Sequence, residues 1–289
     1  MSKKRKWVNL NVTLPENKID KKSIFVYVVI ITVCIISIIV VLYLQFFDGK
    51  TVASVGTLKG KSDYDYDVLK SEFESIFTNK LENEEDKYQS KKEDKSKKLV
   101  YTSYQKKETS DGDYDIDACI PYINIKSEQI QKYNQEIQNA FINKADAIAK
   151  TVNKNNIYSV QYGSYIQDGI LSVVIKASLQ EGGRSQRTII KTYNYSLEED
   201  KEVDLASLLK LKRVEQNYVQ NKINNEIQLG QKKAEDLKAM GHQIFERNLN
   251  NDMYKIQNVD NFYYHDGSIY IIFAYGNEKA TNEVDVAVI

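Results

Sequence analysis

Few residues of this sequence have the types and spacing needed for catalysis, and none of them completes a catalytic pattern. His242 and His265 are too few and too isolated for a His-based metal site. Ser207 and Lys210 have the spacing of a Ser-x-x-Lys nucleophile, but the Ser-Asp-Asn and Lys-Thr-Gly partner motifs are missing, and the leucines around them predict an ordinary short helix. We therefore expect no catalytic, cofactor-binding or metal-binding residues, and no enzyme activity.

Aspartates alternate along the chain at two places, which raises the question of a calcium site. The residues are Asp63, Asp65 and Asp67 in the first series, and Asp111, Asp113, Asp115 and Asp117 in the second. An EF-hand loop needs glycine at its sixth position, but Val68 and Ile116 stand there. Solvated acidic residues are the better interpretation, and on an edge strand they would also discourage aggregation.

The 21 tyrosines raise the question of a binding surface, because aromatic rings with polar tips suit protein and glycan recognition. Tyr193 and Tyr195 are two apart and should share one face of a strand. Tyr162 and Tyr165 are three apart, so only one of them can join that face. The alternative is that these tyrosines simply fill a half-polar sheet.

Hydrophobic periodicity and turn signals predict the elements that position these residues. Helices are expected over 64–81, over 127–152 after an N-cap at Ser127, and over most of 204–250, including Ile244, Phe245 and Leu249. Strands are expected at 99–104, 114–120, 157–167, 170–179, 184–195, 262–264, 268–275 and 284–289, with turns at Asp168-Gly169 and His265-Asp266-Gly267 and an interruption at Pro121. Grouped strands and helices of this kind predict an α+β fold with an antiparallel sheet packed against helices, and no βαβ repeat.

The apolar run Ile24–Phe47 carries no charged residue and would extend about 36 Å as a helix, enough to cross a membrane. Residues 1–23 hold seven basic and two acidic residues, a net charge of +5, so the tail is expected in the cytoplasm and the rest outside. A cleaved signal peptide is the rival, but its apolar region is typically shorter and ends in small residues. We expect a stalk with an amphipathic helix and a charged spacer over 48–98, and the α+β region over 99–289.

The outer part, with 33 basic and 38 acidic residues, has a net charge of −5. Nucleic-acid binding is therefore not expected, because it needs a basic footprint. Cys34 lies in the apolar run and Cys119 outside it, so the two are not expected to pair. Cys119 is expected to be a small buried hydrophobe, and an intermolecular disulfide is the alternative. The charged segment 82–98 is expected to be a solvated continuation of a helix or a disordered spacer.

Residues 113–289 resemble the PdaC/RsiV-like pair of extracytoplasmic domains of unknown function. The resemblance is carried by Tyr114–Ile123 with Asn134–Ile137, by the glycine-pair loop Glu181–Ser185, by Thr192–Leu197 with Lys201–Leu209, and by Asn261–Phe273. Arg184 directly follows the glycine pair, where the family often has alanine and histidine, and the prolines common in the family's last segment are missing. The candidate ligand-binding residues are Tyr162, Tyr165, Tyr193, Tyr195 and Arg184.

The resemblance implies a membrane-anchored binding or sensing protein of the bacterial cell envelope. Its ligand would be an envelope glycan or an extracellular protein. One alternative is an RsiV-like anti-sigma factor that relays an envelope or lysozyme signal. Such a protein needs a cytoplasmic domain that holds a sigma factor, whereas this tail has 23 residues and its segment Trp7–Leu14 alternates like a strand. The tail could therefore make only a short contact with a cytoplasmic partner. A second alternative is an accessory domain of envelope glycan modification.

Overall fold

The computed structural model describes residues 66–277, 279 and 281–289. The tail 1–23, the apolar run Ile24–Phe47 and the first part of the expected stalk lie outside the described residues. Of the helices that the structure describes, none combines the length and the apolar character needed to span a membrane. The compact unit that holds the described residues extends from Asp63 to Ile289.

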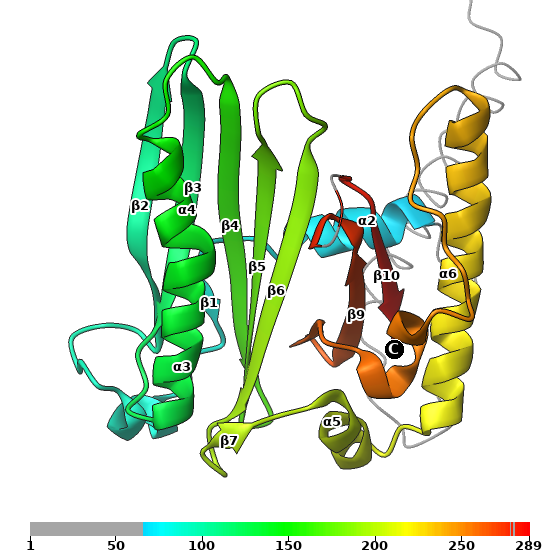
Figure 1. The fold of residues 1–289 in the computed structure, drawn as a ribbon. Helices are drawn as coiled ribbons and strands as arrows, with labels where there is room; N and C mark the ends of the chain where they lie inside the picture. Colours follow the sequence, from blue (N-terminus) through cyan, green and yellow to red (C-terminus); the bar gives the residue numbers. More distant parts are fainter. Residues whose placement is uncertain (1–65, 278, 280) are drawn as a thin grey trace, which may run out of the picture. The chain divides into compact units, whose positions relative to one another are not determined.

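A seven-stranded sheet forms the first half of this unit (Figure 1). Its strands are β1 (Leu81–Glu82), β2 (Val100–Ser110), β3 (Tyr114–Ile123), β4 (Asn156–Gln167), β5 (Ile170–Gln180), β6 (Arg187–Ser196) and β7 (Lys201–Glu202), in the order β2-β3-β4-β5-β6-β7 with β1 beside β4. Most neighbours are antiparallel, as expected, but β3–β4 and β1–β4 are parallel. The β3–β4 pair forms one βαβ crossover, which the sequence pattern did not indicate.

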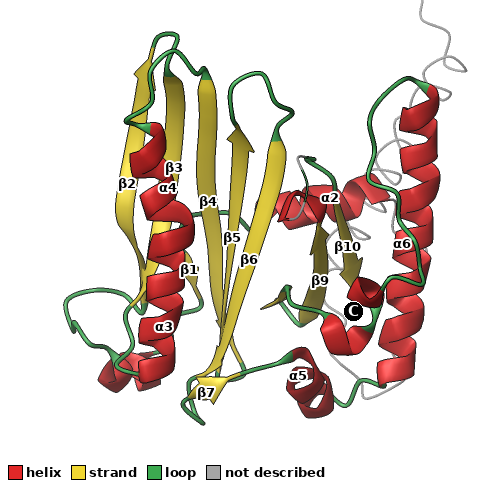
Figure 2. Cartoon of the chain, viewed as in Figure 1, coloured by secondary structure: helices red, strands yellow, loops and turns green. Residues whose placement is uncertain are grey.

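The helical connection between β3 and β4 covers one face of this sheet (Figure 2). It consists of α3 (Glu128–Ile137), a π-helical turn (Gln138–Ile142) and α4 (Asn143–Ile148). The predicted apolar face is confirmed, since Ile130, Tyr133, Ile137, Phe141, Ala145 and Ile148 are all buried. Ser127 occupies the N-cap position, although its side chain makes no capping hydrogen bond.

A three-stranded sheet, in the order β10-β9-β8, forms the second half with β8 (Phe262–His265), β9 (Ser268–Ala274) and β10 (Val284–Val288). The helices α5 (Leu205–Lys212) and α6 (Gln216–Ala239) share a core with one face of it, and α2 (Tyr66–Ser75) shares a core with the other. The β8 edge meets the first sheet through polar side chains: Asn194 Nδ2 donates to the Phe262 carbonyl at 2.9 Å, and the Tyr264 amide donates to Ser172 Oγ at 3.3 Å.

The turns predicted at Asp168-Gly169 and His265-Asp266-Gly267 are confirmed, and each has two central residues. Asp168 and Gly169 have φ of 51° and 74°, and Asp266 and Gly267 have φ of 46° and 76°. Positive φ at both central residues is the requirement of the type I′ turn, and Asp-Gly meets it with little strain. Pro121 does not interrupt β3, because β3 has already left β4 after Ala118 and a bulge in β2 lies beside the proline.

The charged segment 82–98 is neither a helix continuation nor a disordered spacer. It contains a 3₁₀ helix at Asp86–Lys91 that buries Tyr88, and Lys92 forms an ion pair of 2.9 Å with Glu84 while only 6% of the lysine side chain is exposed. The expected helix over 64–81 ends at Ser75, and Leu81 belongs to β1. The many charged residues of this segment suggested a solvated spacer, but the buried Tyr88 packs it against the first core.

Two further expectations were wrong. Helical structure was expected over most of 204–250, including Ile244, Phe245 and Leu249, but α6 ends at Ala239, because Gly241 takes φ of +90° and its amide donates to the Lys238 carbonyl at 2.9 Å, which closes the helix end. Cys119 is half-buried rather than buried, since alternation along β3 places it on the face opposite Ala118 and Ile120. Burial, with the charge of Asp117 second, raises the pKa of the Cys119 thiol.

Candidate functional site

Three of the four candidate tyrosines lie together inside the first core, between the sheet and α3. Tyr162, Tyr193 and Tyr195 are each at most 6% exposed. The Tyr193 ring lies 4.8 Å from the ring of Tyr133, and burial raises the pKa of Tyr193 well above its usual range. Tyr193 and Tyr195 share a face, as the spacing predicted. Their burial gives these side chains a packing role.

The other two candidates lie elsewhere. Tyr165 points to the opposite face of the first sheet, where its hydroxyl accepts a hydrogen bond of 2.5 Å from Asn83 Nδ2. Arg184 is exposed in the β5–β6 turn, two residues before Gln186. The structure therefore brings the five candidates to three separate places and does not assemble them into one surface.

The other chemistry-bearing residues also remain apart. Within the described part of the chain, no three His, Cys, Asp or Glu side chains are placed to hold a metal ion. Asp115 and Asp117 are exposed along β3, and Asp204 caps α5 by accepting from the Ser207 amide at 2.6 Å. His265 packs its ring against Tyr165, with centroids 4.4 Å apart.

The described residues form a cavity of about 450 Å³ between α6, α2, β10 and the β5–β6 end of the first sheet. We call it the α6 cleft. Its walls carry Lys233, Ala234 and Leu237 from α6, and Phe73, Glu74 and Lys176 from α2 and β5, with Gln186, Thr188, Asn282 and Val286 among the other lining residues. No histidine or cysteine lines it, and its hydroxyl groups are those of Ser178 and Thr188. Its lining mixes polar and apolar residues.

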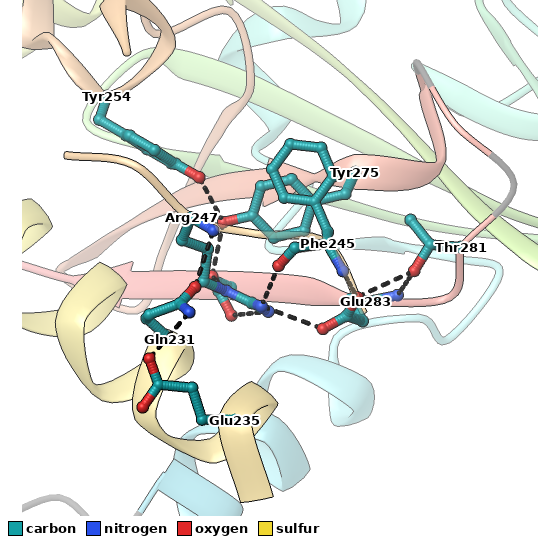
Figure 3. A network of polar contacts seen from close by, with 9 residues as sticks. Gln231, Glu235, Phe245, Arg247, Tyr254, Tyr275, Thr281 and Glu283 are labelled. Carbon is teal, nitrogen blue, oxygen red and sulfur yellow. Dashed lines mark hydrogen bonds and ion pairs between the residues drawn. The ribbon is translucent and has the colours of Figure 1, made fainter. Parts of the chain in front are cut away.

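Arg247, which lines the α6 cleft, forms a buried ion pair within a network of polar contacts (Figure 3). Arg247 binds Asp285 through two bonds, Nε to Oδ2 at 2.6 Å and Nη2 to Oδ1 at 3.1 Å. The two side chains are 3% and 1% exposed. Arg247 Nη1 also donates to Glu283 Oε1 at 3.0 Å and to the Phe245 carbonyl at 2.9 Å. Burial alone would lower the pKa of Arg247, but the bonds and charge of Asp285 outweigh it and raise that pKa.

Aromatic side chains close the network from the other side. The Tyr275 hydroxyl donates to Asp285 Oδ2 at 2.6 Å, and the Tyr254 hydroxyl donates to that of Tyr275 at 3.1 Å. The Phe245 ring stacks on Tyr275 with centroids 4.1 Å apart. Burial, followed by the charge of Asp285, raises the pKa of Tyr275 far above its usual range. Tyr275 is therefore a hydrogen-bond donor rather than a titrating group.

Helix α6 is fixed to this network at two points. The Arg247 amide donates to Gln231 Oε1 at 2.7 Å. A Cβ at Gly230 would lie 2.8 Å from both carboxylate oxygens of Asp285, so only glycine allows the helix to approach this closely. Two carboxylates and a carbonyl accept hydrogen bonds from the guanidinium, so the role of Arg247 is structural. The chemistry that this arrangement supports is the binding of a ligand to a cleft wall that is already in place.

Sequence reasoning missed this network, including Arg247, Asp285 and Tyr275. One signal was present: the alternation of Val284–Val288 places Asp285 on the same face as Ala287. An acidic residue on an apolar face predicts a buried partner. Its partner Arg247, 38 residues earlier, lies in an irregular segment that no periodicity marks.

Comparison with known proteins gives structural neighbours alone. No protein-family model and no curated protein matches the chain. A crystal structure of a DUF3298 family protein from Pseudomonas aeruginosa is 11% identical, with 62% of this chain and 82% of that chain covered and a TM-score of 0.35. A DUF3298 member from Bacteroides fragilis is 13% identical, with 61% and 80% covered and a TM-score of 0.32. The structural neighbours are thus proteins of a family named for a domain of unknown function.

Proposed function

We propose that this chain is a single-pass, membrane-anchored binding or sensing protein of the bacterial cell envelope, without catalytic activity of its own, and that the α6 cleft holds its ligand. The apolar run Ile24–Phe47 with the basic tail before it supports the anchor. The resemblance at Tyr114–Ile123, Glu181–Ser185 and Asn261–Phe273 supports PdaC/RsiV-like membership and an extracytoplasmic location.

The observation that carries the proposal is the preformed α6 cleft. Its volume of about 450 Å³ falls within the range of ligand sites. The buried Arg247–Asp285 pair and the close approach of Gly230 hold the lining residues Arg247 and Gly230 in one arrangement. A cleft that is preformed does not spend binding energy on ordering its own walls. The mixed lining, without His or Cys, suits recognition rather than bond cleavage.

The test is binding by the full chain in a mild detergent to soluble peptidoglycan fragments and to lysozyme. Gln186→Trp and Asn282→Trp change exposed side chains that line the α6 cleft and should fill its mouth. Gln105→Trp, on the exposed face of β2, is the matched control. We expect saturable binding of one probe, weakened at least tenfold by the cleft substitutions and unchanged by the control.

Two results would contradict the proposal. One is the absence of binding to either probe, or binding that the cleft substitutions do not affect. The other is hydrolysis of the peptidoglycan fragments that a single conservative substitution abolishes, which would make the chain an enzyme. The anti-sigma alternative depends on residues 1–23 and is tested separately: recovery of a sigma factor by the tail peptide would favour it.

A further inference from the structure

The wall that the first sheet contributes to the α6 cleft carries hydroxyl groups without partners. Ser178 of β5 and Thr188 of β6 lie directly opposite each other, and both line the cleft. Thr188 is only 9% exposed, and among the described residues neither its hydroxyl group nor that of Ser178 makes a hydrogen bond. A hydroxyl group buried to this degree normally has a partner. Because Thr188 lines the cleft, a ligand there can supply the missing one.

The same row of side chains continues out of the cleft onto an open part of the sheet. Ser159 of β4 lies directly opposite Ser178, so Ser159, Ser178 and Thr188 form one row across three strands. Tyr158, next to Ser159, is buried in the first core, which places the row on the face away from α3. Ser159 is half-buried and Gln161 is exposed, and neither side chain makes a hydrogen bond within the described part of the chain. We call Ser159, Gln161, Ser178 and Thr188 the polar strip.

The charges around the α6 cleft balance. Its lining and the buried network behind it contain three basic and three acidic residues, a formal net charge of zero: Lys176, Lys233, Arg247, Glu74, Glu283 and Asp285. Lys176 forms an ion pair with Glu74, and Arg247 forms ion pairs with Glu283 and Asp285. The polar strip adds no charge. A nucleic acid or another polyanion would need an excess of basic residues, so this surface suits a neutral ligand.

The polar strip also lacks the residues that anchor protein partners. The cores of protein interfaces are enriched in aromatic residues, Met and Arg, whereas the strip offers hydroxyl and amide groups. The cleft adds the amides of Gln186 and Asn282, both exposed. Hydroxyl and amide groups donate and accept hydrogen bonds, as the hydroxyl and acetamido groups of sugars do. Leu237, 42% exposed in the cleft lining, supplies an apolar contact for the C–H face of a sugar ring.

We infer that the α6 cleft holds one part of a neutral glycan chain, and that the chain continues along the polar strip over β6, β5 and β4. This inference rests on the proposed function and names the ligand class of the same cleft. Neighbouring strands are about 4.8 Å apart, so the strip extends the binding surface by roughly 10 Å. The strip ends at β3, where Asp115 and Asp117 are exposed and Asp117 pairs with Lys107 of β2.

The probes are chitin oligosaccharides of two and six sugars, which are neutral and carry both hydroxyl and acetamido groups. They are titrated into the full chain in a mild detergent. The cleft alone can hold the short chain, whereas the long chain also reaches the polar strip, so we expect the long chain to bind at least tenfold more tightly. Gln161→Trp should reduce the affinity for the long chain to that for the short one, and leave the short one unchanged. Gln105→Trp, on the same face but two strands away, is the matched control.

Thr188→Val tests the hydroxyl group inside the cleft. Valine suits a strand and keeps the shape of the side chain, and no hydrogen bond among the described residues is lost, so the thermal midpoint should not fall. One net hydrogen bond corresponds to an affinity change of about two- to tenfold, and both oligosaccharides should lose that much. Thr192→Val is the contrast, because Thr192 Oγ1 accepts from the Phe262 amide at 3.1 Å. It should lower the midpoint and leave binding unchanged.

The outcomes separate this inference from the proposed function. If both oligosaccharides bind equally well and Gln161→Trp has no effect, the polar strip is not part of the site. If Gln186→Trp and Asn282→Trp block binding of lysozyme or peptidoglycan fragments while neither oligosaccharide binds, the cleft stands and the ligand class is wrong. If the cleft substitutions change nothing for any probe, the proposed function fails too. The comparison of chain lengths uses the unaltered chain, so it decides even where a variant does not fold.

Discussion

Replacing Asp285 with Asn should destabilise the domain far more than the loss of one surface charge. Asn keeps the volume of the side chain, but it leaves the Arg247 guanidinium, 3% exposed, without the carboxylate that binds it at 2.6 and 3.1 Å. It also sets an amide against the Tyr275 hydroxyl, which donates to Asp285 at 2.6 Å. Breaking one side of a buried, hydrogen-bonded ion pair costs about 3–5 kcal/mol.

For a unit the size of residues 63–289, about 1 kcal/mol shifts the thermal midpoint by roughly 2–4 °C. We therefore expect Asp285→Asn to lower the midpoint by about 6–20 °C. Urea unfolding followed by circular dichroism would measure the same loss as a free energy. Asp117→Asn is the control, because Asp117 pairs with Lys107 at 3.1 Å while both side chains are more than half exposed.

A double replacement shows whether the cost comes from an unpaired charge. Arg247→Met with Asp285→Leu removes both charges, and apolar substitutes for a buried pair are often neutral. Glu283 keeps its bond of 2.5 Å from the Phe245 amide. We expect the double variant to recover more than half of the loss seen in Asp285→Asn. The reasoning is refuted if Asp285→Asn costs no more than Asp117→Asn, since that would mean that water reaches the pair.

Three more predictions follow from local geometry. Gly276→Ala should cost about 1–3 kcal/mol or prevent folding, because its Cβ would lie 2.1 and 2.6 Å from two backbone oxygens, whereas Gly183→Ala, which meets nothing within 4 Å, should change the urea midpoint little. The hydrogen bond from Lys212 lowers the pKa of Asp168 from its usual value. This carboxylate therefore stabilises the fold above about pH 4, and the effect is lost as the pH falls through the folded pKa. Asp168→Asn should make the free energy of unfolding fall less steeply as the solution is acidified. Cys119, with its raised pKa, should react with iodoacetamide at pH 8 more slowly than free cysteine, and equal rates in a Cys34→Ser background would contradict this.

Features that depend on neighbours in the sequence were predictable. The Asp168-Gly169 turn was readable because positive φ at two successive residues demands such a pair. The face of α3 and α4 was readable because Ile130, Tyr133 and Ile137 repeat at helical spacing, and the core then selects that face. In both places the physical cause lies within a few residues of its effect.

Features that depend on distant partners were not predictable. The Arg247–Asp285 pair joins an irregular segment to a strand, and neither residue alone reveals the other. The parallel register of β3 and β4 is set by how the crossover helices pack, which the spacing of their apolar residues does not specify. Tyr162 and Tyr193 looked like surface recognition residues because tyrosine suits both a binding face and a half-polar core, and the helix that covers them decides which.

The alternation of β10 couples the stability of the domain to the proposed binding. Its odd-numbered residues hold the strand: Asp285 binds Arg247 and touches Gly230 of α6, and Ala287 is fully buried. Val286 lies on the opposite face and lines the α6 cleft. Because α6 forms another wall of this cleft, the Asp285 contacts also set its width. A small loosening at Asp285 should therefore weaken ligand binding in the α6 cleft even where the domain stays folded, and a peptidoglycan fragment or lysozyme that binds Asp285→Asn as tightly as the unaltered chain would show that the cleft is not held by this pair.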